Sequence, residues 1–208
     1  MIYRSRQRPL LNPILAIIGI NLLLFIATLI MGQVIVNYDQ VSFSIYKLHY
    51  YMGLIPIAFW ERPWTILTSM FLHGGFGHIF ANMFTLFFFG SSLLNLVGKN
   101  KFLTVYFGGG ILGNILLLIL SPIFPFSIAI GASGAVFSIA GVLTVMAPKA
   151  KVFVFPIPLP IPLWIAVIGG FLILSFLPFV AWQAHLGGLA FGLIAGFLFR
   201  RKERYYSY

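Results

Sequence analysis

Long stretches without a charged side chain are the feature that most limits how this chain can fold. A helix needs about 20 apolar residues to cross the hydrocarbon core of a bilayer. Six runs fit this requirement, and they lie at about residues 12–32, 76–96, 102–121, 131–147, 161–177 and 182–199. We therefore predict an all-α membrane protein, a bundle of six transmembrane helices that forms a single domain over residues 1–208.

The composition excludes an ordinary soluble domain. Hydrophobic residues make up 61% of the chain and charged residues 8%, whereas charged residues reach about 25% in typical globular proteins. So few polar groups cannot cover the outside of a soluble fold of this size. We expect a multi-pass integral protein surrounded by the lipid bilayer.

The basic residues report topology. A net charge of +10 is a common sign of nucleic-acid binding, but here the 13 Lys and Arg residues lie before, between and after the apolar runs and form no face. With a cytoplasmic N-terminus, all of them except Lys47 and Arg62 lie on the cytoplasmic side, as the positive-inside rule requires. We expect both termini in the cytoplasm and no nucleic-acid partner.

Two connections between the runs stand out. The segment 33–75 is long and contains aromatic residues that favour the membrane–water boundary, so we expect an interfacial loop after the first helix, with His49 also at the interface. The segment Pro148–Pro162 contains alternating prolines and cannot be helical. We expect it to be an extended connection on the cytoplasmic side.

The few acidic residues and the lack of cysteine exclude several chemistries. Asp39, Glu61 and Glu203 all lie outside the runs, so no pair of membrane carboxylates is available for an aspartyl protease or a proton-coupled carrier. A chain without cysteine has no thiol nucleophile and no Cys-ligated zinc. We predict no metal and no cofactor. A small transporter is also disfavoured because the chain has no convincing internal repeat.

Three polar residues fall at one depth on three different runs. In the predicted topology His78, Ser133 and His185 each lie near the outer end of their helix, where an unpaired polar group is costly and suggests function. A serine and a histidine can act as nucleophile and general base without a carboxylate. We therefore predict a catalytic pair of Ser133 and His185.

Other residues support such a site. His78 and Asn82 share a helical face, and with the backbone N–H of Ser133 they form a candidate oxyanion site. Gly188 and Gly192 let two helices approach closely. We interpret Asn114 as a helix–helix hydrogen bonder, and His73 as a residue that stabilises its loop through a hydrogen bond.

Three motifs carry a resemblance to a known family. They are residues 71–82 (FLHGGFGHIFAN), 131–135 (GASGA) and 184–192 (AHLGGLAFG). In order, spacing and placement the sequence resembles the rhomboid intramembrane serine proteases over residues 12–199. The resemblance implies that Ser133 is the nucleophile and His185 the base, with His78, Asn82 and the Ser133 N–H at the oxyanion.

The resemblance also implies a setting for the site. It implies a cavity that opens on the extracytoplasmic face and is closed laterally by the fifth helix, and substrates that are transmembrane segments of other proteins. We expect the membrane of a prokaryotic cell. The sequence departs from the family pattern at Thr65, where an arginine usually follows the tryptophan, so that Arg62 is the stand-in. It departs again at Leu94, in place of a glutamate, and at Phe137, in place of a tyrosine that stacks on the histidine.

Our hypothesis is an intramembrane serine endopeptidase that acts through an acyl-enzyme. The alternative is a catalytically silent rhomboid-like chaperone or binding protein of the membrane. The sequence does not indicate the natural substrate or the oligomeric state.

Overall fold

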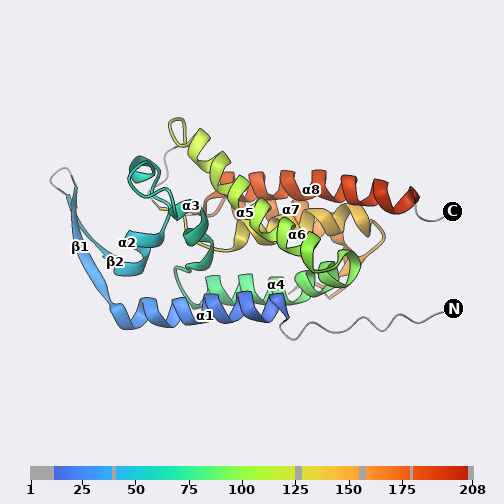
Figure 1. Cartoon of the computed structure of the whole chain (residues 1–208), viewed down its shortest axis with the longest axis horizontal. Coiled ribbons are helices and arrows are strands. Elements are labelled where there is room, and N and C mark those ends of the chain that lie inside the picture. The colour runs from blue at the N-terminus through green and yellow to red at the C-terminus, as the bar shows by residue number, and fades with distance from the viewer. Residues whose placement is uncertain (1–11, 39–40, 125–127, 155–157, 179, 206–208) are drawn as a thin grey trace.

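The computed structural model describes residues 12–38, 41–124, 128–154, 158–178 and 180–205. Its six longest helices coincide with the six apolar runs, and they are α1 (Pro13–Met31), α4 (Phe76–Val97), α5 (Lys99–Leu120), α6 (Ser133–Met146), α7 (Leu163–Ser175) and α8 (Trp182–Tyr205). The start of α1 and the end of α8 lie at the same end of the bundle (Figure 1).

The helices differ in length. Among the described residues, α1, α4, α5 and α8 are long and apolar enough to cross a membrane. The helices α6 and α7 have only 14 and 13 residues. Both are shorter than the runs from which they were predicted, because α6 begins at Ser133 and α7 ends at Ser175, inside the apolar sequence.

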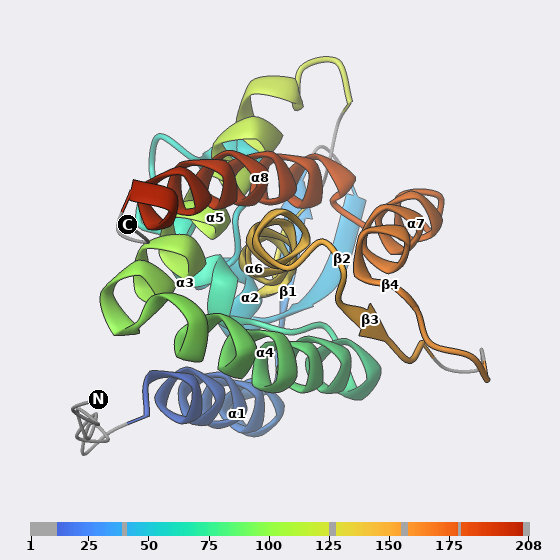
Figure 2. The ribbon, with the colours of Figure 1, turned by 90° about the vertical axis from the view of Figure 1, so that its right-hand side faces the viewer.

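Helix α6 occupies the centre of the molecule. It is surrounded by α4, α5, α7 and α8, while α1 packs on the outer side of α4 (Figure 2). Small residues make this possible: a Cβ on Gly188 of α8 would lie 2.0 Å from the carbonyl oxygen of Gly134. A Cβ on Gly192 would lie 2.1 Å from the carbonyl oxygen of Ser138. The backbones of α6 and α8 are therefore in direct contact.

The connection from α1 to α4 contains a β-hairpin that the sequence-based prediction lacks. Its strands are β1 (Gln33–Tyr38) and β2 (Val41–Tyr46), paired antiparallel with Gln33 opposite Tyr46. The sequence is rich in Val and Ile at this point, and such β-branched residues favour strands. The fold is thus mostly helical, and the long connection contains two strands that we did not predict.

The rest of this connection folds against the bundle as short helical turns. They are α2 (Lys47–Met52), η1 (Pro56–Ala58), α3 (Thr65–Thr68) and η2 (Ser69–Phe71). The Arg62 guanidinium donates a hydrogen bond to the Tyr50 carbonyl and lies 4.6 Å above the centre of the Tyr50 ring. Arg62 therefore stabilises this segment although Thr65 replaces the arginine of the family pattern.

The proline-rich connection between α6 and α7 is extended, as predicted. In its described parts it contains two short strands and no helix, β3 (Lys151–Val152) and β4 (Ile161–Pro162), which pair antiparallel. The Leu163 N–H also donates a 2.9 Å hydrogen bond to the Ala150 carbonyl. We call residues 150–154 with 161–162 the ribbon; its backbone hydrogen bonds join it to the start of α7.

Candidate active site

The structure brings Ser133 and His185 together. Ser133 is the first residue of α6, and His185 lies in the first turn of α8. The Oγ of Ser133 and the Nε2 of His185 are 2.7 Å apart. This distance lies within the range of a competent nucleophile–base pair. The distance between the two side chains is set by the close packing of α6 on α8, whose backbones touch at glycine residues.

Phe137 holds the imidazole ring. The ring centres of Phe137 and His185 are 4.8 Å apart and their planes meet at 33°. Across the described residues, the Nδ1 of His185 is buried and has no hydrogen-bond partner. Ring packing therefore orients the histidine, in the place where serine proteases with a triad use a carboxylate.

Gly131 separates Ser133 from His78. Its φ of +125° is an angle that L side chains rarely adopt, and its N–H donates a 2.9 Å hydrogen bond to the Ser69 carbonyl. A Cβ at this position would lie 2.7 Å from the Nε2 of His78 and 3.7 Å from the Oγ of Ser133. Only glycine lets the imidazole of His78 come this close to the nucleophile.

Asn82 lies one helical turn below His78 on α4. Its Nδ2 donates a 2.9 Å hydrogen bond to the His78 carbonyl, within the same helix. An amide nitrogen carries two hydrogens, so this bond uses one of them. Asn82, His78, Ser133 and His185 all line one cavity.

His73 does not have the role that we expected from the sequence. It is 1% exposed, and its ring nitrogens have no hydrogen-bond partner among the described residues, so the predicted hydrogen bond of its side chain is wrong. Its ring packs edge-on against His78, with ring centres 4.9 Å apart. His49 lies in α2 of the connection between α1 and α4, is 6% exposed, and forms a hydrogen bond with the backbone of His73.

Burial changes the protonation of these two loop histidines. Burial, and to a smaller extent the nearby His78, lowers the pKa of His73 to about 3. Burial also lowers the pKa of His49. Both rings are therefore neutral near pH 7, as expected for imidazoles that lack a carboxylate neighbour.

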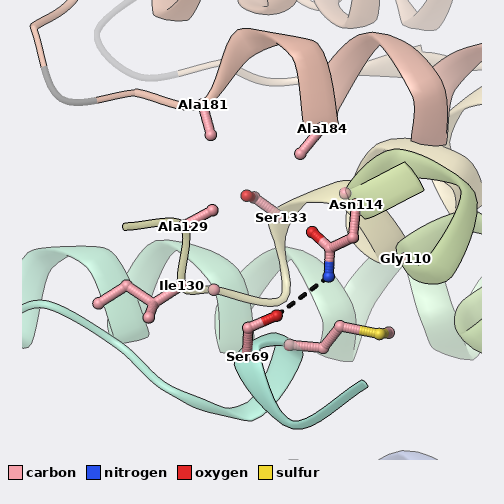
Figure 3. Close-up of a pocket in the computed structure, with 11 residues that line it drawn as sticks. Ser69, Gly110, Asn114, Ala129, Ile130, Ser133, Ala181 and Ala184 are labelled. Atoms are coloured by element: carbon pink, nitrogen blue, oxygen red, sulfur yellow. Dashed lines mark hydrogen bonds between the residues drawn. The ribbon is translucent and has the colours of Figure 1, made fainter. Parts of the chain in front are cut away.

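Asn114 of α5 bonds two short helices of the connection before α4, so it is a helix–helix hydrogen bonder, as predicted. Its Nδ2 donates to the Ile66 carbonyl at 2.7 Å and to the Ser69 Oγ at 3.0 Å. Figure 3 shows this bond below Ser133, beside a small pocket of about 20 Å³ that Ser133, Ser69 and Asn114 line together. Because Ser69 also accepts the Gly131 N–H, Asn114 supports the backbone that leads to the nucleophile.

A large cavity of about 1530 Å³ extends from the Ser133 site between α4 and α7. On α4 it is lined by Phe80, Phe84 and Phe88, and consecutive ring centres are 5.7 Å and 4.7 Å apart. Val152–Val154 and Gly170 line it as well. Sequence reasoning missed these residues, because a stripe of Phe in a membrane helix is the ordinary pattern of a lipid-facing surface.

One family of known proteins matches most of this chain. A family model described as the rhomboid domain matches residues 61–202, which is more than half of the chain. The chain belongs to the rhomboid family. The matched region begins within the connection from α1 to α4 (residues 32–75), which we call the interfacial connection. It includes the site residues on α4, α6 and α8, while α1 and the β-hairpin lie outside it.

Rhomboid relatives come from different organisms. YdcA of Bacillus subtilis, which is named provisionally as a rhomboid protease, is 33% identical over 145 residues, covering 69% of this chain and 71% of YdcA. The mitochondrial rhomboid protein 1 of Saccharomyces cerevisiae is 31% identical, and the match covers 64% of this chain and 40% of the yeast protein. Rhomboid protease GluP of Bacillus subtilis is 32% identical over 64% of this chain and 25% of GluP.

Family membership and the apolar helices together indicate an integral membrane protein. Similar proteins include a bacterial protease and a mitochondrial protein. Membership of the family is therefore found in more than one kind of membrane, and the prokaryotic membrane stays a prediction.

Proposed function

We propose that this rhomboid protein is a serine endopeptidase that cleaves transmembrane segments of other membrane proteins. The observation that carries the proposal is the 2.7 Å distance between the Ser133 Oγ and the His185 Nε2, inside a cavity that is open between two helices. Two relatives whose names include rhomboid protease support the same activity.

The first half of the reaction forms an acyl-enzyme. The Oγ of Ser133 attacks the carbonyl carbon of the scissile peptide bond while Nε2 of His185 takes the hydroxyl proton. The tetrahedral intermediate then collapses, and His185 gives that proton to the leaving amine. The new N-terminus departs, and the other fragment stays bound to Ser133 as an ester.

Three groups are placed to stabilise the oxyanion. The N–H of Ser133 is the first of α6 and has no acceptor within the helix. The imidazole of His78 lies beside Gly131, and the second amide hydrogen of Asn82 is free to point into the cavity. Donors fixed before the reaction stabilise a developing charge more than solvent does.

Water completes the cycle. His185 takes a proton from a water molecule as its oxygen attacks the ester carbon, and then returns the proton to the Ser133 oxygen. The carboxylic acid product leaves. Because the site lies in an apolar bundle, this step needs a cavity that admits water, and the open cavity at Ser133 meets this need.

We also propose that six helices cross the membrane, with both chain ends in the cytoplasm. In this orientation Ser133, at the N-terminus of the short helix α6, lies below the outer surface, and the connection from α1 to α4 lies on its extracytoplasmic side. The positive-inside distribution of Lys and Arg supports this orientation.

Labelling with a fluorophosphonate probe tests the catalytic pair. Wild-type protein should be labelled, and both Ser133→Ala and His185→Ala should lose labelling. Ser92→Ala is the matched control, because its hydroxyl is exposed on α4 and bonds only its own helix. Wild-type protein that neither labels nor cleaves a model transmembrane substrate would favour the catalytically silent chaperone.

A further inference from the structure

The cavity between α4 and α7 is a groove with two different ends. One end holds Ser133 and His185, at the N-terminus of α6. The other end is lined by Val152–Val154 of the ribbon, which follows the C-terminus of α6. The 14 residues of α6 separate these ends by about 20 Å at the rise of an α-helix. The groove therefore extends along most of a membrane-buried segment.

The ribbon forms the floor of this groove. In the view of Figure 2, β3 lies between α7 and α4, at the end of the bundle where α8 finishes. Its backbone pairs with β4 directly before α7, so its position is tied to that helix. Phe153 is 75% exposed although it lines the cavity. An apolar side chain this exposed offers contact area to an occupant of the groove.

Two lysines lie next to this floor without lining the cavity. Lys151 is exposed and directly precedes the cavity-lining residues Val152–Val154, and Lys149 is exposed two residues before it. No acidic residue occurs in the sequence between Glu61 and Glu203, so neither α4, α6 nor α7 carries a charge that opposes them. Flexible lysine side chains keep their ammonium groups in water at the edge of an apolar surface. An acidic group that pairs with them has to come from outside residues 62–202.

We propose that two lysines at the start of the ribbon select substrates by charge: Lys149, directly before the ribbon, and Lys151 within it favour a transmembrane segment whose end at the groove floor carries acidic residues over one that carries basic residues. The proposal rests on the proposed function for the identity of the occupant. An apolar helix matches the Phe80, Phe84 and Phe88 face, and carboxylates match the two lysines. Most membrane proteins carry Lys and Arg at their cytoplasmic ends, so these lysines would repel most other segments.

Binding to the inactive variant Ser133→Ala separates recognition from cleavage. Ser133→Ala is reconstituted in phosphatidylcholine vesicles with a single-span peptide that ends in either two Asp or two Lys residues, and binding is measured by energy transfer between labels. We expect the acidic peptide to bind about fivefold more tightly, the effect of two partly screened ion pairs. Added salt should reduce this ratio.

Charge reversal provides the sharper test. Lys149→Glu combined with Lys151→Glu should invert the preference. The matched control is Lys99→Glu with Lys101→Glu, a pair at the same spacing that begins α5, a helix with no residue in the lining of the groove, whereas Lys151 adjoins the lining residue Val152. This control should keep the wild-type ratio, and unfolding temperatures of both double variants verify that they fold.

The outcomes distinguish the two proposals. Equal binding of both peptides, or an unchanged ratio after charge reversal, overturns charge selection and leaves Lys149 and Lys151 as contacts for lipid headgroups. A clear binding preference without any cleavage by the wild-type protein supports charge selection and overturns the protease activity.

Discussion

At the scale of single residues, the site depends on groups with no charged partner. His185 is oriented by the Phe137 ring, Asn82 bonds a carbonyl of its own helix, and His73 is buried without a hydrogen-bond partner for its ring in the described residues. A charged orienting group would have to be buried here at a large cost in solvation. Neutral rings and amides can orient the site residues with a smaller loss of solvation free energy on burial.

The role of Asn82 is open to a direct kinetic test. Asn82→Ala should lower kcat for a transmembrane substrate about 10²-fold with little change in KM, because an oxyanion donor acts in the transition state. Thr85→Ala is the control: Thr85 lines the same cavity and also bonds a carbonyl of its own helix. It should stay near the wild-type rate. An equal loss in both variants would assign Asn82 to packing.

The buried His73 predicts a dependence of stability on pH. Its pKa is about 3 in the folded protein, against an ordinary value of 6.5, so below pH 6.5 the unfolded chain binds a proton that the folded chain does not. The free energy of unfolding should fall by up to about 1.4 kcal/mol per pH unit as the pH decreases through this range. Unfolding temperatures in detergent from about pH 7.5 to about pH 5 measure this effect.

His73→Phe keeps an aromatic ring against His78 and removes the titrating group. The slope of stability against pH should become shallower in this variant, and part of the remaining slope reflects His49, whose pKa is also lowered by burial. A slope identical to that of the wild type would show that His73 is already neutral in the unfolded chain or protonated in the fold.

At the scale of elements, the contact between α6 and α8 determines the catalytic distance. Gly134 and Gly188 meet backbone to backbone, one residue after Ser133 and three residues after His185. Side chains larger than hydrogen would separate the helices and with them the two catalytic groups. Close packing of small residues therefore serves both stability and chemistry in this pair of helices.

A pair of alanine substitutions tests this coupling. Gly188→Ala places a Cβ 2.0 Å from the Gly134 carbonyl oxygen, so we expect a loss of about 1–3 kcal/mol in stability together with a loss of fluorophosphonate labelling. Gly169→Ala on α7 meets nothing within 4 Å and should stabilise the helix slightly through its higher helix propensity. Retained labelling in Gly188→Ala would contradict the coupling.

At the scale of the whole molecule, the short length of the central helix α6 bears on how deep in the membrane the candidate site would lie. The surrounding helices α4, α5 and α8 are long enough to span the bilayer, while α6 has 14 residues. In the proposed orientation the N-terminal end of α6 lies below the outer membrane surface, and the connection from α1 to α4 lies above it. Hydrogen bonds between Leu54 and Ala129, 2.8 Å and 3.0 Å long, join that connection to the segment before Ser133.

Single-cysteine labelling tests the proposed topology. The chain has no cysteine, so Glu61→Cys and Asn100→Cys each introduce one thiol, at exposed positions before α4 and in the first turn of α5. An impermeant maleimide added to intact cells should label Glu61→Cys and leave Asn100→Cys unlabelled until the membrane is permeabilised. The reverse pattern would invert the orientation and place Ser133 at the cytoplasmic face.

The sequence alone determined the positions of the six apolar helices and the family. A charge-free run long enough to cross a membrane can be recognised from neighbouring residues alone. The three motifs are specific because their Ser, His and Asn residues match the family pattern in order and spacing. The same reasoning missed the strands β1 and β2. The aromatic and apolar composition of this segment indicated a membrane interface, and the pattern of two short strands is a weaker signal. It also left the ends of α6 and α7 too long.

Only the tertiary structure decided which groups meet. The partners of Asn114 lie 45 and 48 residues away in the chain, and the burial of His49 and His73 depends on how the interfacial connection folds onto the bundle. The groove between α4 and α7, with the ribbon as its floor, involves segments distant in sequence. Helix formation in a membrane follows from local hydrophobicity. Long-range contacts depend on which helix surfaces pack against each other, and the sequence by itself does not show this.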